Sequence, residues 1–127
     1  MIAAAIITMT VATAYDAEVN TPLYCDRWHN DLRYHPDQAP FLAWPFDVAG
    51  GQCGDDILVT INDKKYWYKA LDSGLFGKHC VIQSDGYCAP IAVDIPEFFA
   101  PFDGLSHVAK VVNVSEEWRK FNRRESR

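Results

Sequence analysis

The sequence predicts a small β-barrel of the all-β class, with a helix at its C-terminal end. The chain has 127 residues, 49% of them hydrophobic and 23% charged, which suits one domain around one core. Short apolar runs of strand character alternate with turn residues at short spacing, a pattern typical of small barrels whose loops carry the function. Four cysteines in a domain of this size favour two disulfides and an oxidising compartment.

Strands are expected wherever residue types alternate between turn signals. The polar stretch 16–40 is too rich in proline and charge to be a strand, and we expect a long loop there. Asn62 to Lys65 should form a hairpin turn. Because Pro45 lies inside the run 41–46, that run is expected to be an edge strand or an extended segment. The expected strands are 8–15, 41–46, 56–61, 66–71, 91–93 and 108–114.

A very short helix is expected between the last two strands. Pro96 and Glu97 suit its first turn, after Asp94, and Pro101 should end it.

A second helix is expected over residues 115–127, beyond a barrel domain that spans 1–114. Ser115 can cap its N-terminus. Trp118 and Phe121 are its only apolar anchors, so this helix should dock loosely or contact a protein partner.

The first fourteen residues, MIAAAIITMTVATA, allow two interpretations. They resemble the apolar core of a signal peptide, ending in a possible cleavage site. No basic residue precedes the apolar run, however, and the alternation after Thr8 favours a strand. The run is too short to span a membrane.

The charge and the metal-ligand spacing narrow the classes of partner. A net charge of −5 argues against a nucleic-acid surface. No cysteine pair has CxxC spacing and no histidine pair has zinc spacing, so no metal site is expected. No P-loop or dinucleotide fingerprint is present, so no cofactor is expected either. The seven Phe, six Tyr and four Trp residues fill a core, or they form a surface on which sugars stack.

The four cysteines allow three disulfide pairings, and the sequence alone leaves all three open. Cys80 and Cys88 flank a short loop and form the natural local pair. Cys25 would then pair with Cys53.

Asp72 and Asp94 each end an apolar run, in KALDSG and IAVDIP, and we expect them to mark one cleft. Cleavage of a glycosidic bond needs a carboxylic acid whose pKa is raised by burial or by a like charge. The alternatives are structural: Asp72 can form a turn, and Asp94 can cap the short helix. Asp16 can be an ordinary solvated loop residue.

Four pieces of the chain, in this order, resemble the double-psi β-barrel proteins of the RlpA, expansin, barwin and MltA group. They are VATAYD, WPFDVAGGQCGDDILVTIN, KALDSG and VDIPEFFAPFDGLSHVAKV. The resemblance covers about residues 8–114 and implies a six-stranded double-psi barrel.

The resemblance also implies roles for single residues. Asp72 matches an aspartate that acts in lytic transglycosylases, and Asp94 matches an acid of related endoglucanases and expansins. Tyr15 and Asp16 fall where the family has an aromatic residue and a base. The histidine that RlpA-type proteins carry before the Leu-Pro-Phe-like turn is absent. Tyr15, Trp44 and Trp67 are the possible sugar-stacking residues.

The function that the resemblance implies is binding of cell-wall polysaccharide or peptidoglycan by a secreted, periplasmic or cell-surface domain. One alternative is a lytic transglycosylase or glycosidase with Asp72 as general acid. Another is a non-catalytic structural or interaction subunit of a surface or phage assembly.

Overall fold

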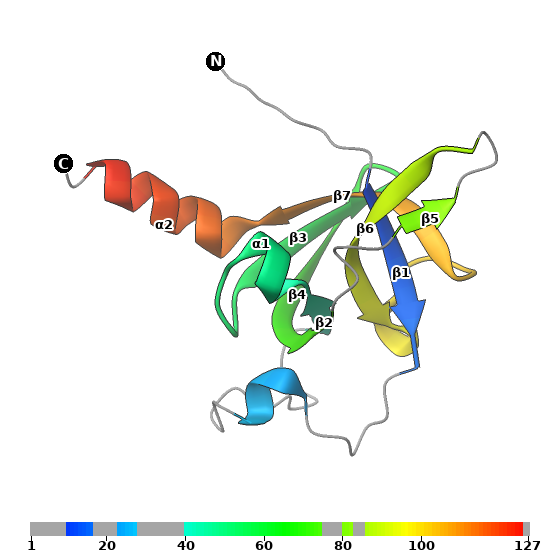
Figure 1. Ribbon diagram of the computed structural model, residues 1–127, viewed down its shortest axis with the longest axis horizontal. Coiled ribbons are helices and arrows are strands. Elements are labelled where there is room, and N and C mark those ends of the chain that lie inside the picture. The colour runs from blue at the N-terminus through cyan, green and yellow to red at the C-terminus, as the bar shows by residue number, and fades with distance from the viewer. Residues whose placement is uncertain (1–9, 17–22, 28–39, 75–79, 83–85, 126–127) are drawn as a thin grey trace.

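Six strands close into a barrel of mixed strand direction in the computed structural model, which describes residues 10–16, 23–27, 40–74, 80–82 and 86–125 (Figure 1). The strands are β1 (Thr10–Tyr15), β2 (Phe41–Trp44), β3 (Asp56–Ile61), β4 (Lys64–Ser73), β5 (Cys80–Ile82), β6 (Cys88–Pro96) and β7 (Ser106–Asn113). The order around the barrel is β1, β7, β3, β4, β2 and β6, and β6 pairs with β1 to close it. Strand β5 pairs with β6 outside this ring. The predicted six-stranded barrel is confirmed.

The described residues also include four helical segments. They are η1 (Tyr24–Arg27), α1 (Phe46–Ala49), η4 (Glu97–Phe99) and α2 (Val114–Glu125). Helix α2 continues directly from β7 and extends away from the barrel (Figure 1). The predicted C-terminal helix is therefore confirmed. Among the described residues, no helix is long and apolar enough to cross a membrane.

The barrel interior is filled by the inward-facing half of each strand. In β3, Ile57, Val59 and Ile61 are buried while the residues between them are partly exposed, as a period of two requires. Every second residue of β2 also joins this core, namely Leu42 and Trp44. The other members are Ala12, Tyr68, Ala70, Val93, Ile95 and Ala109.

A second, smaller apolar cluster lies on the other face of β2. It contains Phe41, which alternates with Leu42 and so points away from the barrel interior. Leu71, Leu23 and Cys25 pack with it, so this cluster fixes η1 against β2 and β4.

Two disulfides form, Cys25–Cys53 and Cys80–Cys88. The natural local pair and its complement are therefore both confirmed. The first disulfide ties η1 to the segment before β3, and the second links the start of β5 to the start of β6. Two disulfides in a small domain indicate an oxidising, extracytoplasmic compartment.

Strand β2 is not at an edge, and that prediction was wrong. It lies between β4, which it joins in parallel, and β6, which it meets at Ala43. The proline signal misled because Pro45 follows the strand, where it needs no ladder hydrogen bond. There the backbone turns into α1, and the N–H groups of Val48 and Ala49 both donate to the Pro45 carbonyl.

Strand β6 is longer than predicted, and the short helix begins later. Asp94 pairs with Thr13 of β1 and Ala43 of β2, so the ladders on both sides keep the chain extended through Pro96. Helix η4 then starts at Glu97, with no side-chain capping hydrogen bond. Strand β4 likewise continues beyond the expected Leu71 to Ser73.

Ser115 does not cap α2, and that prediction was also wrong. The side-chain oxygen of Asn113 accepts the backbone N–H of Glu116 at 2.9 Å. The Ser115 hydroxyl instead accepts the N–H of Asp56 at 2.9 Å and so links the helix to β3. Of the strand predicted over 8–15, residues 10–15 form β1, and Thr8 and Met9 lie outside the described residues.

A polar network around Asp55 attaches α2 to the barrel. Both carboxylate oxygens of this buried residue accept hydrogen bonds from Arg119, at 3.0 and 2.6 Å. The Asn113 amide and the Gln52 N–H also donate to Asp55, at 3.0 and 2.9 Å. A side chain at Gly51 would place a Cβ 2.8 Å from the Asn113 amide nitrogen, so only glycine fits beside this network. The helix is held by charge and hydrogen bonds, and the expected apolar anchors are exposed.

Candidate functional site

The two predicted aspartates lie on either side of one residue of β2. Ala43 is the register partner of Asp72 on β4 and also of Asp94 on β6. Strands are spaced by about 4.8 Å, so the two aspartate Cα atoms are roughly 10 Å apart. Ala43 points outward because Leu42 and Trp44 on either side of it point inward, and its two register partners share that face. In β4 the register shift beside Ala43 brings Asp72 onto this face, although Ala70 points inward. Two motifs that are well separated in the sequence thus meet on one surface.

Asp72 is held by three donors from three elements. The Tyr15 hydroxyl at the end of β1 donates to Oδ2 at 3.0 Å. The backbone N–H groups of Tyr24 in η1 and of Ser73 donate to Oδ1 at 3.2 and 3.0 Å. The bond to Ser73 is a local contact within β4. The other two bonds are long-range, so Asp72 also joins β1 and η1 to β4.

Asp94 has a different environment. Its Oδ1 accepts the Thr13 hydroxyl at 2.9 Å, and the described residues contribute no other hydrogen bond to this carboxyl. Burial and the charge of Asp72 raise the pKa of Asp94, and the Thr13 hydrogen bond only partly offsets them. The capping interpretation of Asp94 was wrong, because the residue lies within β6.

Tyr15 connects the two carboxyls electrostatically. Burial raises the pKa of its hydroxyl far above the ordinary value, and the charge and hydrogen bond of Asp72 and the charge of Asp94 raise it further. The hydroxyl therefore keeps its proton and remains a donor to Asp72. The site thus contains one carboxyl held by three donors, Asp72, and one whose pKa is raised, Asp94.

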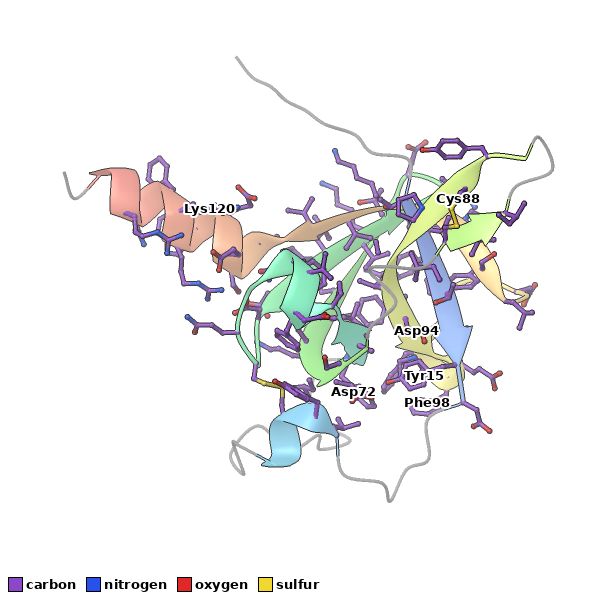
Figure 2. The ribbon with its side chains drawn as sticks, viewed as in Figure 1. Tyr15, Asp72, Cys88, Asp94, Phe98 and Lys120 are labelled. Carbon is purple, nitrogen blue, oxygen red and sulfur yellow. A yellow bond between two sulfur atoms is a disulfide. The ribbon has the colours of Figure 1, made fainter. Side chains whose placement is uncertain are left out.

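An aromatic cluster lies beside these polar groups. The ring of Phe98 in η4 is 55% exposed and meets Phe41 and Phe99 edge to face, with centroids 6.4 and 4.5 Å apart. Tyr15 is the register partner of Pro96, just before η4, so this cluster and the aspartates share one end of the barrel. Figure 2 shows Phe98, Tyr15, Asp72 and Asp94 gathered there.

The other three predicted site residues make none of the contacts described above. Trp44 is buried in the barrel core, where its Nε1–H donates to the Gly50 carbonyl at 3.0 Å. Trp67 is exposed, but it lies five residues before Asp72 on β4, about 17 Å along the strand. Asp16 is exposed and directly follows β1.

Sequence reasoning missed Thr13 and Phe98. Thr13 could have been found, because it lies two residues before Tyr15 and so on the same face of an alternating strand. Phe98 could not be told apart from core phenylalanines, since only its position in η4 exposes it. Among the described residues, no three His, Cys, Asp or Glu side chains gather to hold a metal ion.

No family model matches the chain, and neither a curated protein nor a solved structure is significantly similar to it. The geometry and chemistry of the chain itself therefore carry the functional assignment.

We expect Asp94→Asn to raise the midpoint of thermal unfolding near neutral pH. A raised pKa means that the folded protein binds the Asp94 proton more tightly than the unfolded chain does, so stability falls as pH rises above about 4. Asparagine removes this titration, and its amide oxygen can still accept the Thr13 hydroxyl. Calorimetry should show that the midpoint of Asp94→Asn lies above that of the parent near neutral pH and that this difference disappears at about pH 3.

Asp63→Asn is the matched control, because Asp63 is exposed in the turn between β3 and β4 and its left-handed φ of 66° suits asparagine equally well. It should leave the midpoint unchanged at both pH values. If Asp94→Asn were less stable than the parent near neutral pH, Asp94 would have a purely structural role.

Proposed function

We propose that this protein is an extracytoplasmic domain of the double-psi β-barrel type that binds cell-wall glycan at the face carrying Asp72 and Asp94. The observation that carries the proposal is the shared pairing of both aspartates with Ala43. Three of the four pieces that resemble the family each contribute at least one residue to this face. VATAYD supplies Tyr15, KALDSG supplies Asp72 and VDIPEFF supplies Asp94.

The strand pairing supports the double-psi interpretation. Among six barrel strands, two pairs are parallel, β1 with β6 and β2 with β4, and each pair joins strands that are distant in the chain. The other pairs are antiparallel. Such a mixed ring needs long crossing connections, unlike an up-and-down barrel built from hairpins.

The chemistry of the face suits a sugar. Carboxylate oxygens accept hydrogen bonds from hydroxyl groups, and an exposed aromatic ring covers the apolar face of a pyranose. Asp94 and Phe98 supply these two features, and Tyr15 and Asp72 hold the surface between them. The two disulfides support an extracytoplasmic location, where cell-wall glycan is found.

The second candidate function is cleavage of the bound glycan, and the raised pKa of Asp94 favours it. A general acid must hold its proton until the glycosidic oxygen needs it. Asp72 already accepts three hydrogen bonds, whereas Asp94 accepts only the Thr13 hydroxyl among the described residues and keeps an oxygen for a ligand. We therefore assign the acid role in this candidate to Asp94, in place of the Asp72 expected from the sequence.

Co-sedimentation with insoluble peptidoglycan, cellulose and chitin tests binding. The protein should sediment with at least one of them, and Phe98→Ala should weaken retention roughly tenfold, as loss of a stacking ring does. Trp67→Ala is the matched control, because this ring is about as exposed as Phe98 and lies far along β4. Absence of retention on all three glycans, or equal loss in both variants, would refute the proposal.

Release of soluble fragments separates the enzyme from the binding domain. If the domain cleaves its ligand, Asp94→Asn should abolish release while keeping retention on the solid glycan. Asp63→Asn should retain both. Retention without any soluble product from the parent protein would leave a binding domain and eliminate the enzyme.

A further inference from the structure

The C-terminal helix α2 presents an exposed aromatic pair. Trp118 and Phe121 are 60% and 51% exposed, and their rings stack with centroids 5.7 Å apart. The helix extends away from the barrel, so this pair lies apart from the aspartate face (Figure 2). In a helix of a single small domain, such side chains would ordinarily face the core.

The attachment of α2 fixes the direction of this pair. Arg119 points to the buried Asp55 and bonds both of its oxygens. Each residue of a helix is rotated by about 100° from the one before, so Trp118 and Phe121 lie about 100° and 160° away from Arg119 around the axis. The Asp55–Arg119 ion pair therefore holds the aromatic pair outward.

The charge of the chain is divided between the barrel and this helix. Residues 114–127, helix α2 and the two residues after it, contain five basic residues and three acidic residues, a net charge of +2. Since the whole chain carries −5, the 113 residues before them carry −7. Helix α2 is about 18 Å long, more than twice the screening length of about 8 Å at physiological ionic strength. Its basic end can therefore approach an anionic surface that would repel the barrel.

These features together point to one kind of partner. We infer that α2 binds an anionic membrane surface, with Trp118 and Phe121 inserted among the lipid headgroups and with Lys120 and Arg123 close to the phosphates. Helices that lie in a membrane interface combine an aromatic or apolar face with a strongly polar face that is rich in Lys and Arg. Tryptophan also prefers this interface to the bilayer core.

A lipid surface suits this pair better than a protein surface does. Two half-exposed aromatic rings offer far less area than the roughly 800 Å² that each partner of a stable protein complex buries. A headgroup layer needs no complementary shape, and it adds an electrostatic attraction of the correct sign.

Sedimentation of the full-length protein with lipid vesicles tests this inference. Vesicles of equal parts phosphatidylglycerol and phosphatidylcholine should bind the protein, and vesicles of phosphatidylcholine alone should not. Added salt should weaken binding. The double variant Trp118→Ser and Phe121→Ser should lower the partition constant roughly tenfold or more, because both inserted rings are lost.

Two further variants make the result specific. Trp67→Ser is the matched control, because Trp67 is also about half exposed but lies on β4, and its partition should equal that of the parent. Lys120→Gln with Arg123→Gln keeps the aromatic pair and should lose the preference for phosphatidylglycerol. Equal binding to both kinds of vesicle, no binding at all, or the same loss in Trp67→Ser would overturn the inference. So would a dimer in sedimentation equilibrium that the aromatic double variant abolishes.

Discussion

Arg119→Met should lower the free energy of unfolding by about 2–3 kcal/mol and the thermal midpoint by roughly 10 °C. The substitution leaves Asp55 only 4% exposed and without its cationic partner. Removing one member of a buried ion pair is strongly destabilising because the other charge remains in a poor solvent. Arg119 itself is 26% exposed, so water can partly replace it, which keeps the loss below that of a fully buried pair.

The same ion pair predicts an acid-sensitive contribution to stability. Burial acts to raise the pKa of Asp55, but the hydrogen bonds of Arg119, Asn113 and Gln52 outweigh it and hold the pKa below its ordinary value. The stabilisation is therefore complete above about pH 4 and is lost as pH falls through the lower folded-state pKa. Chemical denaturation across this range should show this contribution in the parent protein and lose it in Asp55→Asn.

Arg123→Met is the matched control for Arg119→Met. Arg119 and Arg123 both pair with Glu116, at 2.6 and 3.5 Å, but the Arg123 side chain is 63% exposed. An exposed pair contributes about 0–1 kcal/mol, so this variant should stay close to the parent. If Arg119→Met were equally mild, Asp55 would be stabilised by Asn113 and Gln52 alone, and α2 would not depend on the ion pair.

The barrel was predictable because its signals are local. The alternation in Asp56–Ile61, the hairpin turn at Asn62 and Asp63, and the apolar runs ending at Asp72 and Asp94 all reflect side-chain period and turn chemistry. Which strands pair depends on long-range contacts that no local signal reports. Strand β2 pairs with β4 and β6, and β6 pairs with β2 and β1, and these pairings close the ring. The edge position predicted for residues 41–46 failed for that reason.

The site was predictable only in part for a related reason. Asp72 and Asp94 could be named from the end of each apolar run, and the strand register brings them together. The exposure of the tryptophans could not be predicted, because it depends on which of the two alternating faces of each strand points into the barrel. Trp44 lies on the inward face of β2, and Trp67 lies on the outward face of β4.

The Asp55 network was missed because Asp55 and Arg119 are 64 positions apart and each is an ordinary polar residue in the sequence. An acidic residue in the glycine-rich segment before β3 is typical of a turn. Only the return of the chain through β7 into α2 brings Arg119 beside Asp55. Long-range polar contacts of this kind leave no periodic signal in the sequence.

Loss of the Cys25–Cys53 disulfide should have the largest effect of all, on both stability and the candidate site. The double variant Cys25→Ala and Cys53→Ala releases a loop with a sequence separation of 28 residues, which costs about 3.5 kcal/mol in the chain-entropy account. Cys25 is also fully buried with Leu23, Phe41 and Leu71, so its truncation weakens the cluster that fixes η1.

Tyr24 connects the Cys25–Cys53 disulfide to the candidate site. Its backbone N–H donates to Asp72, and its position in η1 depends on the neighbouring Cys25. Glycan retention should therefore fall together with stability in the double variant, even at a temperature where the barrel remains folded by circular dichroism.

The double variant Cys80→Ala and Cys88→Ala is the control. This disulfide spans only 8 positions and joins β5 to β6 away from Asp72, so its loss should cost about 2.5 kcal/mol and leave glycan retention intact. Denaturant titration of both variants, with retention measured on the folded fraction, separates the two effects. Full retention in the Cys25 and Cys53 variant would mean that η1 contributes nothing to the aspartate face, and that Tyr15 and Ser73 alone are enough to hold Asp72.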